Sequence, residues 1–495
     1  MSTDINYERP PLKNTAAVNV DNTRITDYEV FCILDKLKPT ATGLDGLPAW
    51  FLRIAAPVFC GPIADLINLS LMKSTVPSQW KQVRIRPVPK TSTPLQPADY
   101  RPISITPVLA RLMERFVVRR YIYPALSSPP PTLQFNDQFA FRPTGSTTAA
   151  IIHLLNAVIN MLSNEPYVIV ISLDFSKAFD TVRHSTLLHK LSLLDLPDHV
   201  YNWLTDVFSG RSHCTVFNQQ QSSFQNITAS IIQGSALGPA AYVVTAGDLT
   251  TVEPGNELCK YADDTYIIIP ASNVDTRQAE LDNISTWAQK NNLRLNCAKS
   301  CEVVFSNTRR RRRQFEQPPP LPGIKRQHSL KMLGVHIADD FSVGQHVQRL
   351  TTSCAQTLYA LRVLRHHGMN NSDLQLVFRA VVVARLTYAA SAWRGFITAA
   401  SRQRINALTD RAKRLGYCAE DLPTVDELCD VADDDLFYKI VCYSNHVLHN
   451  IIPPPSTASQ HYNLRPRTHS LQLTEHTTHL SDCNFITRML YKNVY

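Results

Sequence analysis

Apolar residues recur with helical spacing near both ends of the chain. From Thr26 to Lys73 this spacing is broken only by the loop 39–46, which is rich in turn residues. Toward the other end, an amphipathic helix is predicted by apolar residues spaced 3, 4, 4, 3 and 3 apart, namely Val347, Leu350, Cys354, Leu358, Leu361 and Leu364. The sequence Ser372–Gln375 has the pattern of a capping box and predicts the start of the next helix. Both ends of the chain are therefore expected to be helical.

The middle of the chain combines short apolar runs with further helical segments. Strands are predicted at 81–90, 167–174, 258–261, 265–269 and 331–337, where β-branched residues cluster between turn residues. Helices are predicted from Pro102 to about Leu126, over 186–208 and over 276–290. The segment beyond Pro453 is expected to be mostly irregular, and 309–322 is expected to be an exposed basic and Pro-rich loop.

Composition is that of an ordinary globular chain. The 495 residues are 44% hydrophobic and 18% charged, which excludes a mainly disordered or coiled-coil protein. The length allows about three units of roughly 150 residues. The net charge of +9 is uneven, because the stretch 346–417 alone contains eleven Lys and Arg residues against two Asp residues. A surface that follows phosphates would have this excess, although solvated helix faces would also explain it.

Cysteine usage and the N-terminus indicate the cell compartment. The eleven cysteines are odd in number and none forms a CxxC pair, which favours a reduced, intracellular protein of the nucleus or the cytoplasm. The first residues, MSTDINYERPPLKN, have no apolar core of a signal peptide. No uninterrupted apolar run reaches about 18 residues, so no membrane partner is expected.

Three acidic residues stand out as candidates for chemistry. Asp174 ends a hydrophobic strand, and Asp263 and Asp264 lie in the turn of a predicted hairpin. A lone Asp-Asp turn is more often structural than catalytic. If the strand and the hairpin are neighbours in one sheet, however, the three carboxylates meet at its edge, and two of them about 4 Å apart repel by about 4 kcal/mol at an effective dielectric near 20. Oxygen ligands of this kind favour Mg²⁺, and two such ions can activate a hydroxyl and stabilise a leaving oxygen at phosphorus.

The order of several further blocks resembles the reverse transcriptases of non-LTR (LINE-type, jockey- or CR1-like) retrotransposons. The YADD block alone is a weak match, but eight blocks in the family's order over about residues 25–450 are specific. These blocks are LKPTATGLDGLPAWFL (37–52), VPK with DYRPISI (88–105), FAFRPTGSTTAA (139–150), LDFSKAFD (173–180), QGSALGP (233–239), YADD (261–264), NLRLNCAKS (292–300) and KMLGV (331–335).

The resemblance implies two metal ions and a set of roles around them. Asp174 and Asp263 would hold two Mg²⁺ ions, or Mn²⁺ in their place, with the Phe175 carbonyl as a further ligand. Asp264 would be the third acid, and Lys299 would protonate the pyrophosphate.

Further matches place the nucleotide and the primer. Phe179 corresponds to the steric gate that excludes a ribose 2′-hydroxyl, because an aromatic ring fills the space that the hydroxyl needs. Contacts with the incoming nucleotide are also implied for Lys90, Arg101, Gln233 and Gly234, and contacts with the primer end for Leu333 and Gly334. Each of these residues also has an ordinary explanation. Phe179 would be a core aromatic residue, Lys90 a solvated strand end and Lys299 a surface lysine.

The resemblance implies an α+β right-hand polymerase with an antiparallel palm sheet backed by helices. The expected units are a loose segment 1–24, fingers 25–160, palm 161–340, a helical thumb 341–450 and a tail 451–495. The expected reaction is RNA-directed DNA synthesis, with an RNA template, a DNA primer or duplex and dNTPs as partners. The Arg309–Arg313 run would be a nuclear address, an RNA contact or a solvated loop.

Other interpretations remain open at this point. Fingers that begin near residue 25 leave no room for the N-terminal endonuclease of full-length elements, so a nuclease would have to come from another protein. A catalytically silent retroelement remnant would bind RNA without turnover. A group II intron maturase would carry a helical RNA-binding domain after the thumb, and a plain basic α+β protein would use the acids only as caps and turns.

Overall fold

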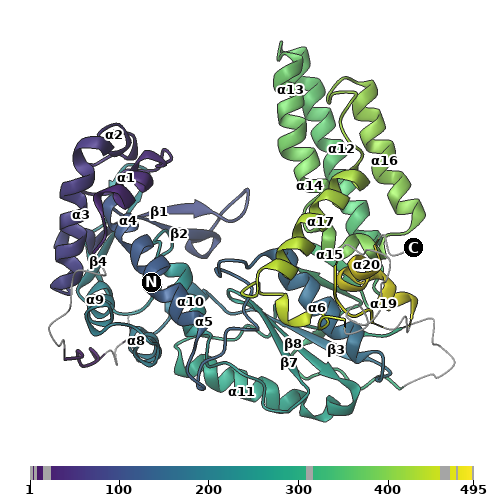
Figure 1. Cartoon of the computed structure of the whole chain (residues 1–495), viewed down its shortest axis with the longest axis horizontal. Helices are drawn as coiled ribbons and strands as arrows, with labels where there is room; N and C mark the ends of the chain where they lie inside the picture. Colours follow the sequence, from purple (N-terminus) through teal and green to yellow (C-terminus); the bar gives the residue numbers. More distant parts are fainter. Residues whose placement is uncertain are drawn as a thin grey trace.

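The computed structural model describes residues 4, 8–14, 24–307, 316–456, 469–474 and 478–492. The Arg309–Arg313 run and most of the segment 1–24 lie outside the described residues. Figure 1 shows a helical unit at each end of the molecule, with a β-sheet between them.

The central sheet is mostly antiparallel and is covered on both faces. Its strand order is β10 (Lys325–Arg326), β9 (Cys301–Phe305), β3 (Val168–Leu173), β8 (Asp264–Pro270) and β7 (Glu257–Tyr261). Five of the six β3 side chains are buried, which explains why this strand is a continuous apolar run.

Side chains alternate between the two faces of this sheet and so divide the core into two. Ile169, Ile171 and Leu173 pack in one core with the helices α8 (His184–Leu193) and α9 (Asp198–Phe208). Val168 and Val170 pack in the other core, with α6 (Thr147–Met161). Because successive strand residues point to opposite faces, one strand sequence serves both cores.

The N-terminal helices lie at one end of the molecule, in purple in Figure 1. They are α1 (Asp27–Asp35), α2 (Ala49–Ile54) and α3 (Ala56–Met72). Beside them is a second sheet in which β1 (Gln82–Pro89) pairs antiparallel with β2 (Tyr100–Ile105) and parallel with β4 (Arg211–Phe217). This sheet is completed by β5 (Gln220–Gln221) and β6 (Gln225–Ile227), and it leads into α4 (Val108–Val117), η4 (Val118–Ile122) and α5 (Tyr123–Ser127).

At the opposite end a group of helices, here called the tower, rises above the central sheet (Figure 1). Its longest member is α12 (Gly344–His366), which confirms the predicted amphipathic helix and buries five of the six predicted apolar residues. The other members are α13 (Asn371–Val377), η7 (Phe378–Val383), α14 (Ala384–Leu386), α15 (Ala390–Trp393), η8 (Arg394–Phe396), α16 (Ala399–Arg414) and α17 (Val425–Cys442).

Mixed helices and sheets with an antiparallel central sheet confirm the predicted α+β class, and β1, β3, β7, β8 and α11 (Arg277–Lys290) confirm predicted elements. Several element predictions were wrong. The segment 331–337 is a hairpin of β11 (Ser329–Met332) and β12 (Val335–Ala338), because Leu333 and Gly334 both have positive φ and form a two-residue turn. The segment 186–208 is split into α8 and α9 around Pro197.

Two more corrections concern helix ends and the tail. The cap of α13 is Asn370, whose side chain accepts the Asp373 N–H at 2.9 Å, so Ser372 opens no capping box. The described part of the tail is not mostly irregular, because α19 (His479–Cys483) and α20 (Phe485–Tyr491) follow Thr478. α20 buries Phe485 and Leu490 against the core that contains α6 and the tower.

Among the described residues one helical run, Asn371–Phe396, is long and apolar enough to cross a membrane by length and composition alone. Of its most apolar stretch, 44% is buried inside the fold. Leu374, Phe378 and Val382 are fully buried in the tower core. Packing within the protein therefore accounts for the apolar character of this run.

Candidate active site

The three predicted carboxylates come together at one edge of the central sheet. The register pairs Leu173 with Thr265 and Tyr261 with Asp264, so Asp174 lies one residue beyond a paired position and opposite Asp264. Residues directly opposite each other on neighbouring strands have Cβ atoms about 4.5–5.5 Å apart. Asp263 is in the turn between β7 and β8, beside both. The proximity expected from the sequence is thus present in the fold.

Electrostatics confirm that these groups influence one another. Burial, followed by the charges of Asp263 and Asp174, raises the pKa of Asp264 to about 6. The pKa of Asp263 is also raised, mainly by burial and then by Asp174. Like charges in a partly dry site disfavour ionisation, and among the described residues no cation contributes to the pKa shifts of Asp263 and Asp264.

A buried glutamine holds the turn that carries Asp263. Ala262 has a φ of 56° and donates its backbone N–H to Gln138 Oε1 at 3.0 Å. The same oxygen accepts the Ala140 N–H at 3.0 Å, and the Gln138 residue is only 1% exposed. Phe139 donates its N–H to the Lys260 carbonyl at 2.8 Å. The segment before α6 therefore fixes the left-handed turn next to the catalytic candidate.

Asp174 is oriented by the loop before β9. Its Oδ2 accepts a hydrogen bond from Asn296 Nδ2 at 3.2 Å, and its carbonyl accepts the Asn296 N–H at 2.8 Å. The Asp174 backbone N–H donates to Ser300 Oγ at 3.2 Å. Phe175 follows in an isolated antiparallel bridge with Leu295. That the Phe175 carbonyl binds a metal ion stays a prediction.

The donor set fits a hard divalent cation but is not a closed cage. Across the part of the chain that the structure describes, no three or more His, Cys, Asp or Glu side chains converge closely enough to hold a metal ion by themselves. Mg²⁺ commonly takes one or two protein carboxylates and completes its shell with substrate phosphates and water. Asp174, Asp263 and Asp264 offer oxygen donors and uncompensated charge for that arrangement.

A continuous set of contacts, here called the wall, connects β2 with the segment after Asp174. Ser104 donates its N–H to the Gln233 carbonyl at 2.7 Å, and Gln233 Nε2 donates to Asp180 Oδ1 at 2.8 Å. Gly234 has a φ of 118°, and a Cβ added there would lie 2.3 Å from the Ser104 carbonyl oxygen. Glycine is thus required by the backbone conformation and by the close approach of β2.

Phe179 forms the next part of this wall. It lies in the short helix α7 (Ala178–Thr181), and its carbonyl accepts the Ile231 N–H at 2.7 Å. Its ring stacks on Tyr242 of α10 (Gly238–Thr245), with centroids 4.6 Å apart and ring planes 22° apart. Phe179 is thus held next to Asp180, whose carboxylate accepts from Gln233. Its role as a steric gate stays a prediction.

The predicted cations lie at the ends of these elements. Arg101 pairs with Val88 in the β1–β2 hairpin and is exposed. Lys90 Nζ donates to the Ala98 carbonyl at 2.9 Å. The positive charge of Lys90 counteracts part of the rise in pKa that burial causes at Asp180. Lys299 is exposed in the turn whose Asn296 holds Asp174. All three are accessible to a ligand, and their roles stay predictions.

The two-residue turn at Leu333 and Gly334 is held between the sheet and the tower. Tyr388, between α14 and α15, donates its hydroxyl hydrogen to the Leu333 carbonyl at 2.9 Å. The Tyr266 hydroxyl on β8 accepts a backbone hydrogen bond from Leu333. The ring of Tyr388 also lies 3.6 Å from where a Cβ on Gly334 would be. The position of this turn is thus coupled to the tower.

The cationic excess of 346–417 is partly neutralised by the following helix. Arg394 forms ion pairs with Asp430 and Asp433, and Arg402 lies 3.9 Å from Asp426, all three acids being on α17. Exposed cations remain on three helices of the tower, namely Arg349 and Arg362 on α12, Arg379 on η7, and Arg404, Arg411 and Arg414 on α16.

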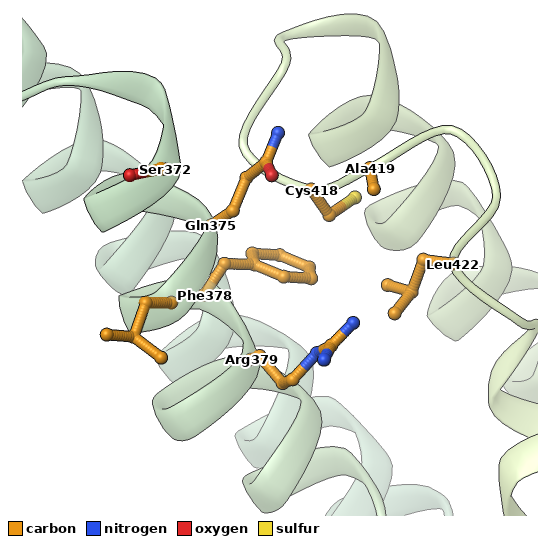
Figure 2. A pocket seen from close by; sticks show the side chains of 8 residues that line it. Ser372, Gln375, Phe378, Arg379, Cys418, Ala419 and Leu422 are labelled. Carbon is orange, nitrogen blue, oxygen red and sulfur yellow. The ribbon is translucent and has the colours of Figure 1, made fainter.

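A cavity of about 230 Å³ lies within the tower and is separate from the carboxylates. Figure 2 shows Phe378 and Arg379 on one side of it and Cys418 and Leu422 on the other. Its lining contains no acidic residue, and Phe378 and Cys418 are buried. It therefore offers no carboxylate that could bind a divalent cation for phosphoryl chemistry.

Sequence reasoning missed the residues that support the site. Gln138, Asp180, Asn296 and Tyr388 act through contacts between segments far apart in the chain. Three of them lie in or next to the blocks noted above, which was the only available signal. Tyr388 lies in the predicted helical segment and had no distinguishing pattern.

Comparison with known proteins agrees with this geometry. Residues 88–337, just over half of the chain, match the family described as reverse transcriptase (RNA-dependent DNA polymerase). The RNA-directed DNA polymerase from mobile element jockey of Drosophila melanogaster is 27% identical over 360 residues, covering 68% of this chain and 38% of that protein. The probable RNA-directed DNA polymerase from transposon X-element of the same fly is 26% identical over 375 residues, covering 71% and 39%.

Among solved structures, telomerase from Candida tropicalis in complex with a fragment of telomeric RNA gives a TM-score of 0.42 at 11% identity. It covers 76% of this chain and 65% of that one. The chain spans less than half the length of the two curated relatives.

Proposed function

Because this chain belongs to the reverse transcriptase (RNA-dependent DNA polymerase) family, we propose that it extends a DNA primer on an RNA template. In this reaction the primer 3′-oxygen forms a bond to the α-phosphorus of a dNTP, the bond from that phosphorus to the β-phosphate oxygen breaks, and pyrophosphate leaves. The observation that carries the proposal is the meeting of Asp174, Asp263 and Asp264 at one sheet edge.

Reverse transcriptases in general use divalent metal ions, and two Mg²⁺ ions, or Mn²⁺ in their place, fit this site. Asp174 and Asp263 would hold them, with the Phe175 carbonyl as a further ligand and Asp264 as the third acid. Bound ions of this kind supply charge neutralisation and activation of an attacking hydroxyl. Asn296 keeps the Asp174 carboxylate pointing to the shared edge, and Gln138 fixes the turn of Asp263.

The wall from β2 to α7 would receive the nucleotide. Arg101 and Lys90 would face its triphosphate, where cations offset charge that develops during transfer. Gln233 and Gly234 would lie against the nucleotide, and Phe179 would exclude a 2′-hydroxyl. Lys299, exposed beside Asn296, would give a proton to the leaving pyrophosphate.

The rest of the chain would hold the nucleic acid. We assign residues 25–160 to fingers, 161–340 to palm, 341–450 to thumb and 451–495 to a tail. The unpaired cations of the tower would follow the phosphates of a template–primer duplex with little sequence preference. An RNA template and a DNA primer would be met inside the cell, which supports our proposal of a nuclear or cytoplasmic location.

The test is primer extension on matched RNA and DNA templates of one sequence, with dNTPs and Mg²⁺. We expect complementary DNA on the RNA template and none after chelation of the metal with EDTA. Template binding is measured in parallel by fluorescence anisotropy. A folded protein that binds the template without extending the primer would refute the polymerase proposal and support a silent retroelement remnant.

A further inference from the structure

A buried tyrosine backs the residue that faces the sugar. Tyr242 is 1% exposed, and its ring lies against Phe179 in a stacked geometry, 4.6 Å between centroids. Phe179 is only partly buried, so one ring face rests on Tyr242 while the side chain borders the site. Aromatic stacking of this kind is worth about 0.5–1.5 kcal/mol beyond the buried area.

The same tyrosine is influenced by the carboxylates. Burial, followed by the charges of Asp263 and Asp264, raises the pKa of Tyr242. Tyr242 is thus stacked on the predicted gate and lies within the electrostatic range of two predicted metal ligands. Tyr242 is part of α10, which begins at Gly238, five residues after Gln233, whose side chain donates to Asp180.

Hydrogen bonds fix the backbone around Phe179, and within the described part of the chain Tyr242 is the aromatic ring that stacks on the Phe179 ring. The carbonyl of Phe179 accepts the Ile231 N–H at 2.7 Å, and the neighbouring Asp180 accepts from Gln233 at 2.8 Å. These bonds hold the chain and leave the rotation of the side chain to be set by packing. A ring that stacks face to face restricts that rotation more than an aliphatic side chain would.

We propose that Tyr242 is a positioning residue for sugar discrimination, which holds the Phe179 ring where a ribose 2′-hydroxyl would collide with it. The inference rests on the proposed function, because the selectivity is that of nucleotide addition. Removing the Tyr242 ring lets the Phe179 ring move away, so ribonucleotides are accepted more readily. Removing only the hydroxyl leaves the stack and the selectivity in place.

The experiment measures single-nucleotide addition of a dNTP and of the matching rNTP by the full chain on an RNA template. The readout is the ratio of kcat/KM for the two substrates. We expect Tyr242→Leu to lower this ratio by roughly 2- to 13-fold, the range that the stacking energy gives at 1.36 kcal/mol per tenfold change. Tyr242→Phe should keep the ratio of the wild type.

Two controls separate positioning from general damage. Phe305→Leu removes another fully buried ring, which packs on Phe341 and is not part of the wall. This variant should leave the ratio unchanged. In a Phe179→Ala background, Tyr242→Leu should have no further effect on the ratio. Where Tyr242→Leu lowers the yield of folded protein, Tyr242→Met replaces it.

The outcomes distinguish this inference from the proposed function. A ratio in Tyr242→Leu that equals the wild-type ratio, with or without an equal loss of activity for dNTP and rNTP, would overturn the positioning role while leaving polymerase activity established. Absence of extension by the wild type would refute the proposed function instead. A changed ratio in Tyr242→Phe would assign the effect to the hydroxyl and contradict the stacking explanation.

Discussion

At Gly234, one added methyl group should displace the backbone of the proposed nucleotide site. A Cβ at this residue would lie 2.3 Å from the Ser104 carbonyl oxygen, whereas ordinary contacts begin near 3.4 Å. The β2 strand or the Gln233–Gly234 backbone must therefore move by about 1 Å, the difference between these distances. The φ of 118° adds backbone strain of about 1–3 kcal/mol for any L-residue.

A displacement of about 1 Å at a substrate-positioning element can cost on the order of 100-fold in rate. We therefore expect Gly234→Ala to lower kcat/KM for dNTP addition by about that factor, with a smaller loss of stability. Single-nucleotide extension and urea unfolding measure the two effects separately.

Gly210→Ala is the matched control. Gly210 also has a positive φ, 65°, but a Cβ there would have no atom within 4 Å. It should share the backbone strain and keep the activity. Activity of Gly234→Ala within about 3-fold of the wild type, or an equal loss in Gly210→Ala, would refute the steric reasoning.

Three further predictions concern other parts of the site. Because the pKa of Asp264 is raised to about 6, a proton competes with a metal ion at this carboxylate, and the apparent affinity for Mn²⁺ should rise from pH 5 to 7 and then level off. Without metal, the free energy of unfolding should fall as pH rises through 6, because the folded state holds the proton more tightly than the unfolded state. Electron paramagnetic resonance of free Mn²⁺ checks this, and an equally steep dependence in Asp264→Asn would contradict it. Tyr388→Phe removes a hydrogen bond to Leu333 worth about 1 kcal/mol and should shorten extension products in a trap-chase assay more than it slows the first addition; an unchanged length distribution would count against it. Lys190→Met should lower the free energy of unfolding by about 1–3 kcal/mol, because it leaves the buried acceptors Thr245 and Asn291 without their donor, whereas Asp248 is partly exposed to water. An unchanged urea midpoint would show that the network is dispensable.

Much of the catalytic edge could be predicted because it depends on local sequence. An apolar β-branched run that ends in Asp174 and a hairpin with two acids in its turn specify strands whose ends carry the carboxylates. Their pairing was expected only from the resemblance, since the partner of a strand depends on contacts distant in the chain. The register that places Asp174 opposite Asp264 is a property of the folded sheet.

Other features depend on tertiary contacts and had no local signal. The 331–337 segment has the composition of one strand, and its turn is seen only because Leu333 adopts a positive φ that Tyr388 stabilises. The stack of Tyr242 on Phe179 joins two helices through residues that lie 63 positions apart in the sequence. The charge excess of the tower was overestimated because α17, just beyond the counted stretch, supplies Asp430 and Asp433 to Arg394.

The most direct measurement is primer extension on an RNA template by the wild type and by Asp263→Asn, which keeps the shape of the side chain and removes its charge. Both proteins are first shown to unfold at similar urea concentrations and to bind the template equally. The account predicts Mg²⁺-dependent extension by the wild type and a loss of at least about 100-fold in the variant, in line with the loss of a group that stabilises transition-state charge. Equal extension by both proteins would contradict the assignment of the carboxylate cluster as the catalytic centre.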